Sequence, residues 1–492
     1  MNSRLLSLIA IILLTACSKV TENKSYYEIV INESHGGSTD FNSGIYEEGT
    51  ELIIKALPDP GYRFKMWEGI ESTSQYVNIN VEMSLSIKPI FELDVIYKNE
   101  NVPHLVEDLV DSSGYIFAIE NGQKSCYLID HNGNQINRWD FDLNLGQDIE
   151  ISKDGNLIGL FKVSDPNITF GGQGGIIRKI SKEGNTIWEY RISDENEIAH
   201  HDIELLPNGN ILALVWTRID KQIANEVGFM SDGDVFIEKI KEINPTTNEV
   251  VWVWNSWDHI VQNANNNLSN YGVISEKTEK INILYNNNST GHPFIPQGDI
   301  MHANGIEYIE DLDLIVLSVN FYNEVWLIDH STTQIEASSS SGGNFNKGGD
   351  LIYRIGNSKT YNNDGTSTFD FNHHPSINKV DNNYQLLIFN NNNKDGVSRI
   401  MEFKLPDFNS TLSPTTNAEL ILDFTDENLF FPRVGGAQRL PNGNTLICEG
   451  DYGFWEINNN KEVVWKYDGL GKSFWRSLFY SKDSPEIINI LN

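Results

Sequence analysis

Basic residues and cysteines are both scarce in this sequence. Of its 492 residues, 36 are Lys or Arg and 68 are Asp or Glu, so the formal net charge is −32 at pH 7. A chain this acidic repels phosphate backbones, which argues against nucleic acid as a partner. Three cysteines are too few for a disulfide scaffold. The hydrophobic fraction of 39% still provides for a sizeable core, and the length suffices for two or three domains.

Long apolar runs are also lacking, except at the N-terminus. Residues 1–18 read MNSRLLSLIAIILLTACS, with Arg4 before an apolar run that ends at small residues. The run is too short to span a bilayer comfortably, and it ends as a cleaved signal does. The segment Leu14–Cys17 resembles the bacterial lipobox, in which cleavage leaves a lipidated cysteine. An ordinary signal peptide with a chance cysteine is the alternative.

We therefore expect a lipoprotein signal peptide over residues 1–17 and a lipid anchor at Cys17 as the only attachment to a membrane. The mature protein would be exported and would be periplasmic or at the cell surface. The two other cysteines, Cys126 and Cys448, could pair in such an oxidising compartment. Otherwise they serve as small buried apolar residues.

Residues 26–93 differ from the rest of the chain in their sequence pattern. Short alternating apolar runs are separated by turn residues, which predicts antiparallel strands and a small β-rich domain. The sequence GYRFKMWEG at residues 61–69, followed by KPIF at residues 88–91, resembles the bacterial repeat modules related to internalin B repeats. This resemblance implies a spacer or adhesion module without chemistry of its own.

The remainder, residues 104–480, contains one pattern six times: a polar turn followed by an apolar strand. The copies lie at residues 111–119, 152–161, 206–215, 310–319, 380–389 and 440–449. Further strand-like runs, many with tryptophan, follow each copy. Turns and strands repeated without helices are typical of a β-propeller, so we expect an all-β chain with six blades. Two sandwiches are the alternative, but they would not explain a turn that recurs at blade-like spacing.

Histidines precede three consecutive turns, at His200-His201, at His302 and at His373-His374. In a propeller the run before this turn is the innermost strand, so three neighbouring blades would direct imidazoles into one axial pocket. A single histidine in a strand is more often structural, but three at comparable positions favour a functional cluster. Such a cluster could bind zinc or copper, or it could supply a nucleophile and acid–base groups. Closely spaced pairs such as His-x-His are absent, which disfavours the metal.

At these residues the sequence resembles the bacterial arylsulfate sulfotransferase family. The resemblance covers most of residues 104–470, and the order and spacing of its pieces carry it. The pieces are Trp257–His259, Met301–Asn304, Trp326–Thr333, Gly348–Asn357, His374, Phe389–Asn391 and Gly435–Leu446.

The resemblance implies a six-bladed propeller and a sulfuryl transfer from a phenolic sulfate ester to a phenolic acceptor. It implies no nucleotide donor and no metal, so we expect no cofactor. By motif position, His374 takes the sulfuryl group transiently, and His201 and His302 are the other catalytic histidines. The neighbouring His200 and His373 should then point the other way along their strands. A transfer in two steps predicts ping-pong kinetics.

Two departures from the family pattern put the activity in question. Asn320 stands where an arginine is expected to hold the sulfuryl oxygens, and Pro375 stands where an acidic residue is expected. Asparagine donates a hydrogen bond but carries no charge. Arg433 or Arg218 could compensate. The alternative is therefore a propeller that binds an anionic or aryl ligand without turning it over. A metal-dependent hydrolase is a third hypothesis.

Overall fold

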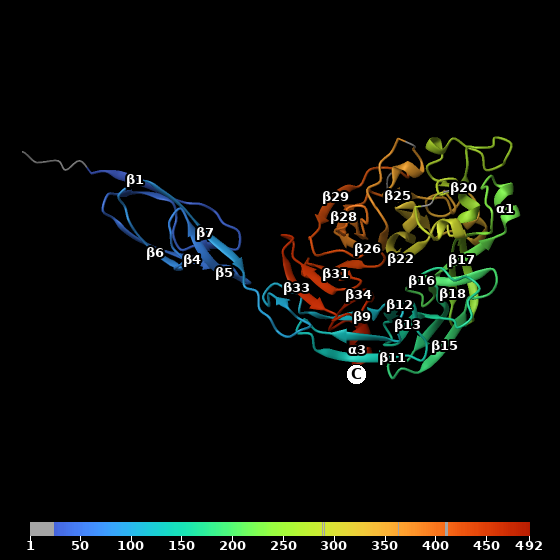
Figure 1. Cartoon of the computed structure of the whole chain (residues 1–492), viewed down its shortest axis with the longest axis horizontal. Helices are drawn as coiled ribbons and strands as arrows, with labels where there is room; N and C mark the ends of the chain where they lie inside the picture. The colour runs from blue at the N-terminus through green and yellow to red at the C-terminus, as the bar shows by residue number, and fades with distance from the viewer. Residues whose placement is uncertain (1–23, 288, 290, 363, 409–411) are drawn as a thin grey trace, which may run out of the picture. The chain divides into compact units, whose positions relative to one another are not determined.

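The computed structural model describes residues 24–287, 289, 291–362, 364–408 and 412–492. The predicted signal peptide and Cys17 lie outside this part of the chain. The chain divides between Asp94 and Val95 into two compact units (Figure 1). In the described residues, no helix has the length and apolar character needed to cross a membrane.

The first unit consists of seven strands in two sheets. One sheet has the order β3-β1-β7-β5 and the other β2-β4-β6. Their cores meet around Trp67, which is fully buried and whose indole N–H donates to the carbonyl of Ser74. The strands are β1 (Tyr26–Ile31), β2 (Gly37–Thr39), β3 (Gly44–Glu47), β4 (Glu51–Pro58), β5 (Tyr62–Glu68), β6 (Tyr76–Asn80) and β7 (Leu85–Leu93).

The second unit contains six antiparallel sheets of four or five strands. The first sheet consists of β11 (Gln135–Asp140), β10 (Ser125–Ile129), β9 (Gly114–Glu120) and β34 (Phe474–Ser481). The second consists of β12 (Leu145–Ile151), β13 (Leu157–Lys162), β14 (Gly175–Ile180) and β15 (Thr186–Arg191). The third consists of β16 (Glu197–Leu205), β17 (Ile211–Ile219), β18 (Val235–Asn244) and β19 (Glu249–Asn255).

The fourth sheet consists of β22 (Ala303–Ile309), β23 (Leu314–Val319), β24 (Glu324–Asp329) and β25 (Tyr353–Ile355). The fifth consists of β26 (Asn372–Val380), β27 (Asn383–Asn390), β28 (Arg399–Lys404) and β29 (Glu419–Phe424). The sixth consists of β30 (Gly436–Arg439), β31 (Thr445–Glu449), β32 (Gly453–Ile457), β33 (Val463–Asp468) and β8 (His104–Leu105). The α-helices are short: α1 (Lys221–Glu226), α2 (Gln334–Ala337) and α3 (Pro485–Leu491).

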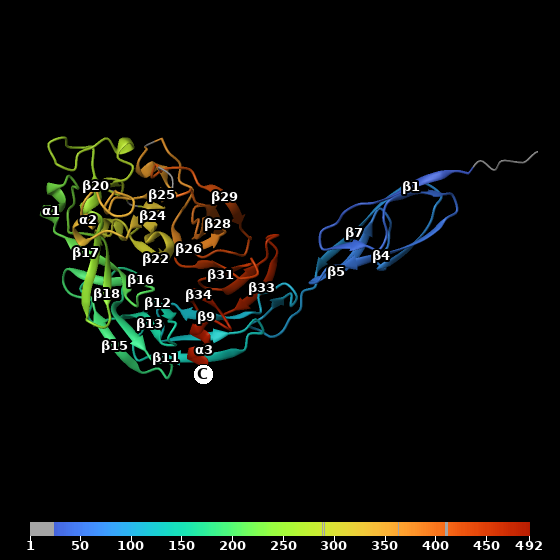
Figure 2. The same cartoon turned by 180° about the vertical axis from the view of Figure 1, so that it is seen from behind.

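One edge strand of each sheet lies at the centre of the unit. These inner strands contact one another in a closed cycle, in the order β12, β16, β22, β26, β30, β34 and back to β12. The sheets follow each other around this inner ring in Figures 1 and 2. Strands from opposite ends of the unit close it, because β34 pairs with β9 and β8 pairs with β33.

The expectation of an all-β chain is confirmed, and each of the six predicted apolar runs falls on the second strand of a different sheet. Three of the six turns that precede these strands contain a glycine with a positive φ between 77° and 89°: Gly155, Gly209 and Gly443. Glycine adopts this left-handed conformation without steric cost.

Cys126 and Cys448 are both buried and do not form a disulfide in the structure. Burial raises the pKa of both thiols.

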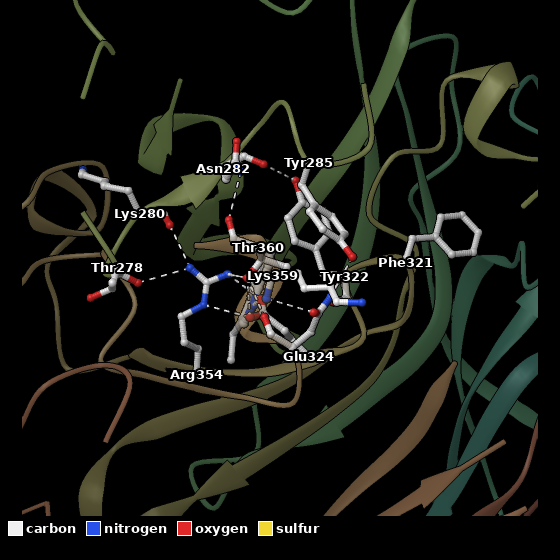
Figure 3. A network of polar contacts seen from close by, with 12 residues as sticks. Thr278, Lys280, Asn282, Tyr285, Phe321, Tyr322, Glu324, Arg354, Lys359 and Thr360 are labelled. Carbon is white, nitrogen blue, oxygen red and sulfur yellow. Dashed lines mark hydrogen bonds and ion pairs between the residues drawn. The ribbon is translucent and has the colours of Figure 1, made fainter. Parts of the chain in front are cut away.

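A long connection joins β19 to β22 and contains η1 (Ser256–His259), β20 (Ile260–Val261), η2 (Ile274–Glu276), β21 (Ile281–Asn282) and η3 (Ile295–Gln297). A buried ion pair between Glu324 on β24 and Arg354 on β25 holds it in place (Figure 3). The guanidinium of Arg354 also donates to the carbonyls of Thr278 and Lys280 in the connection. Thus the irregular connection is fastened to the fourth sheet.

Candidate active site

A cavity of about 610 Å³ lies where three histidine-bearing inner strands begin. His201 on β16, His302 just before β22 and His373 on β26 line it. The ring centroids of His201 and His302 are 4.7 Å apart. Polar residues Asn121, Gln147, Asn320, Asn393 and Arg433 and the aromatic residues Phe294, Phe321 and Phe371 also line the cavity.

His374 does not line this cavity. Its ring is buried against Gly436 and borders a separate hollow of about 150 Å³ beside Glu307 and Gln438. The pairing register of β26 shifts between His373 and Ser376, and His374 has a φ of 47°. His201 and His302 have nearly the same φ, 53° and 52°, and both line the cavity, so this backbone conformation alone does not decide which side chain faces it. The prediction that His374 faces the site and His373 turns away differs from the cavity lining, to which His373 contributes and His374 does not.

The imidazole of His373 is held in one tautomer by Asn391. The Nδ2 group of Asn391 donates to the carbonyls of Phe431 and Val434, so its Oδ1 faces Nδ1 of His373 at 2.6 Å as an acceptor. His373 must then carry its proton on Nδ1, which leaves a lone pair on Nε2. Burial lowers the pKa of His373 to about 3. This histidine is neutral at physiological pH and has the electron pair that a nucleophile needs.

His302 has a carboxylate for its partner. Asp299 lies three residues earlier, is fully buried, and accepts hydrogen bonds from both the backbone N–H and Nδ1 of His302. The ring stacks on Phe321 with centroids 4.5 Å apart and an interplanar angle of 13°. The carboxyl group orients the ring and holds a proton on Nδ1. Of the histidines that line the cavity, His302 is thus the one with a carboxyl partner.

His201 has a second histidine for its partner. Its Nδ1 lies 2.9 Å from Nδ1 of His200, whose Nε2 lies 2.9 Å from Oε2 of Glu238. His200 does not line the cavity, but stacks on Trp216 with centroids 3.8 Å apart and planes 4° apart. Burial lowers the pKa of both His200 and His201 well below the ordinary value.

Asn320 lines the cavity, but one of its amide N–H groups is already hydrogen-bonded to the backbone. It is 3% exposed, and its Nδ2 donates to the carbonyl of Asn372 at 3.0 Å. The side chain that stands in place of the expected arginine therefore spends one of its two N–H donors on the backbone.

Of the two arginines considered as replacements, one reaches the cavity. Arg433 lines it and lies over the ring of Phe431 at 5.8 Å. The described residues offer Arg433 no ion pair or hydrogen bond, so its guanidinium donors are available to an anion. Arg218 instead pairs with Asp234 on the surface. A third arginine, Arg476, is buried and paired with Asp148 and Asp202.

Aromatic side chains occupy the side of the cavity next to His302. His292 and Phe294 come from the long connection, and Phe321 follows β23. The rings of His292 and Phe321 are 4.5 Å apart. Burial lowers the pKa of His292 to about 4, so it is uncharged near neutral pH. Flat apolar faces beside polar histidines suit a ligand that joins an aryl ring to a charged group.

Asp258, His259 and the Gly348–Asn357 motif lie outside the lining of this cavity. His259 bonds Asp350 at 2.7 Å and the carbonyl of Ala337 at 2.9 Å. Across the described ranges, no group of three or more His, Cys, Asp or Glu side chains is arranged to hold a metal ion.

Sequence reasoning missed the partners that set the state of each histidine. Asp299 had a local signal, because it precedes His302 by three residues. Asn391 lies within the Phe389–Asn391 piece of the family resemblance but had no role there. Glu238 comes from β18, the third strand of its sheet, and nothing in the sequence connects it with His200.

Comparison with known proteins gave two family matches. Residues 100–468 match the arylsulfotransferase (ASST) family, and residues 27–90 match the divergent InlB B-repeat domain. No curated protein sequence matches the chain significantly.

Similar solved structures include a putative 6-phosphogluconolactonase from Bacteroides fragilis, with 12% identity and a TM-score of 0.35, covering 94% of this chain and 99% of that one. A periplasmic gluconolactonase from Pseudomonas aeruginosa has 8% identity and a TM-score of 0.35, covering 74% and 98%. The WD40 domain of Pan2 from Neurospora crassa has 10% identity and a TM-score of 0.32, covering 74% and 89%.

Proposed function

Because the chain belongs to the arylsulfotransferase family, we propose that it moves a sulfuryl group from a phenolic sulfate ester to a phenolic acceptor. The reaction proceeds in two steps through a sulfohistidine, without a nucleotide donor or a cofactor. The six sheets of the second unit are the blades of a β-propeller, preceded by the small β-rich unit. The single observation that carries the proposal is the meeting of three differently partnered histidines in one cavity with aromatic walls.

His373 is the nucleophile in this proposal. Its Nε2 attacks sulfur, the bond between sulfur and the aryl oxygen breaks, and the phenolate leaves. In the second step the acceptor oxygen attacks the sulfuryl group and Nε2 is released. A fixed neutral tautomer in the cavity supports His373 for this role in preference to His374.

Positive charge for the sulfuryl oxygens comes from His302 and Arg433. Sulfuryl transfer resembles phosphoryl transfer in that catalysis is mostly positioning and charge stabilisation. The Asp299 carboxylate supports an imidazolium at His302, and Arg433 has uncommitted donors at the cavity. Asn320 contributes at most its second amide N–H.

A second candidate function is binding of an aryl or anionic ligand without turnover. It is favoured by the neutral Asn320 in the position where the family resemblance implies an arginine. Loss of a donor to a developing oxyanion typically costs about 10² to 10³ in rate.

Turnover of a nitrophenyl sulfate with a phenol distinguishes these functions. We expect nitrophenol release that is lost in His373→Ala by at least about 10²-fold and is largely retained in His374→Ala. Mass spectrometry after reaction with donor alone should find a sulfuryl adduct, and fragmentation should assign it to one of the two adjacent histidines. Ligand binding without nitrophenol release would support the binding function, and an adduct on His374 would refute our assignment.

We also propose that the chain is exported and anchored by a lipid at Cys17, in the periplasm or at the cell surface. The lipobox-like segment Leu14–Cys17 supports this. Cell fractionation of the full chain and of Cys17→Ala tests it, since only the former should partition with membranes. Equal partitioning of both would refute the anchor.

A further inference from the structure

Three buried side chains form a continuous line of hydrogen bonds that ends at the cavity. Glu238 on β18 and His200 are fully buried, and His201 is 4% exposed. The two links are the 2.9 Å contact between Glu238 Oε2 and His200 Nε2 and the 2.9 Å contact between the Nδ1 atoms of His200 and His201. Only His201, at the end of the line, borders the cavity.

Each link holds one proton, because two facing N–H groups would repel and two facing lone pairs would leave no bond. The line therefore has two states. When Glu238 is a carboxylic acid and donates, His200 donates from Nδ1 and His201 carries its proton on Nε2. When Glu238 is a carboxylate, both links reverse, and Nε2 of His201 has a lone pair.

The surroundings keep the line in place while its protons move. The second carboxyl oxygen of Glu238 accepts the backbone N–H of Ala303 at 2.7 Å. The His200 ring is stacked on Trp216. Since both links already have hydrogen-bond length, reversal requires movement of protons and no movement of a side chain.

We propose that Glu238 and His200 form a proton relay that lets His201 protonate the leaving phenolate and deprotonate the incoming phenol. The relay rests on the proposed sulfuryl transfer and adds two positioning residues that act through His201. In the first step, Nε2 of His201 gives its proton to the phenolate oxygen, His200 passes its Nδ1 proton to His201, and Glu238 passes its proton to His200. In the second step, the acceptor phenol returns one proton along the same line.

Electrostatics agree with storage of the proton on the carboxyl group. Burial lowers the pKa of both histidines and raises the pKa of Glu238, where Asp299 adds to the effect. The relay thus works between neutral imidazoles, and it never requires a buried imidazolium at His200.

A series of aryl sulfates with different leaving phenols tests the relay. Glu238→Gln keeps the size of the side chain and an acceptor for the N–H of Ala303, but it cannot exchange the proton. The burst of phenol release without acceptor should fall about 10²-fold or more with phenyl sulfate, whose leaving group needs a proton. The leaving group of dinitrophenyl sulfate needs no proton, so with this substrate the burst should fall by less than about threefold.

Glu242→Gln is the matched control, since Glu242 lies on the same strand and bonds His330 away from the cavity. Its effect should be the same for all leaving groups. If the burst in Glu238→Gln falls by the same factor with every leaving group, Glu238 has only a structural role and the relay is refuted.

NMR with ¹⁵N-labelled histidine separates this failure from failure of the proposed function. In the wild type, raising the pH should move the proton of His201 from Nε2 to Nδ1, and in Glu238→Gln it should stay on Nε2. If no aryl sulfate is turned over, the proposed function fails while this tautomer change still tests the line itself. If the tautomer of His201 changes with pH in the same way in the wild type and in Glu238→Gln, the relay is refuted in either case.

Discussion

The buried ion pair between Arg354 and Glu324 gives a prediction whose size follows from burial. Both side chains are fully buried, and Arg354 also donates to Thr360 and to two carbonyls of the long connection. Arg354→Met leaves Glu324 as an uncompensated charge, which costs about 3–5 kcal/mol. The unfolding entropy is about 2.1 cal/mol/K per residue, so for roughly 400 residues in this unit Tm should fall by about 4–6 °C.

Scanning calorimetry of the variant measures this shift, and two further variants make the result specific. Arg218→Met removes the solvent-exposed pair with Asp234, which is worth about 1 kcal/mol or less, so its Tm should change by about 1 °C at most. The double variant Arg354→Met/Glu324→Leu should recover part of the loss, because no buried charge remains. Equal shifts for Arg354→Met and Arg218→Met would refute the reasoning.

Three predictions concern the chemistry of the cavity. Asn391→Leu frees the tautomer of His373 and should slow the burst at least about tenfold, whereas Asn391→Asp keeps an acceptor at Nδ1 and should retain more activity; a reversed order would contradict the tautomer argument. Arg433→Met should raise KM for aryl sulfates about 10- to 100-fold, as expected for hydrogen bonds to a charged group, and an unchanged KM would exclude Arg433 as anion ligand. Because burial lowers the pKa of His373 to about 3, its reactive neutral form persists as the pH falls; the burst rate should show no acid limb from His373 near pH 6.5 and should fall only toward pH 3.

The sequence was sufficient for the all-β class and for the placement of the repeats. Each predicted apolar run is a second strand, because a polar turn followed by a run of apolar residues is a local signal that tertiary contacts do not override. The order of His373 and His374 was not predictable in this way. Strand alternation correctly places two adjacent side chains on opposite sides, but it does not say which of the two lines the cavity.

Partners that come from other strands were equally beyond the sequence. Glu238 reaches His200 only because β16 and β18 flank β17 in one sheet. Arg354 lies within the Gly348–Asn357 piece of the family resemblance, and Glu324 lies just before the Trp326–Thr333 piece. No rule of residue spacing predicts that this ion pair holds the long connection in place. Such contacts depend on how sheets pack, and pairwise residue spacing carries no information about that.

The roles that we propose for the three cavity histidines follow from what each Nδ1 faces. An amide oxygen at His373 leaves a permanent lone pair on Nε2, as a nucleophile requires. A carboxylate at His302 favours a charged donor, as an anion requires. A second imidazole at His201 allows either state, as an acid that must later act as a base requires. Position in the cavity alone therefore does not determine the chemistry of the three imidazoles, because each proposed role also depends on the group at Nδ1.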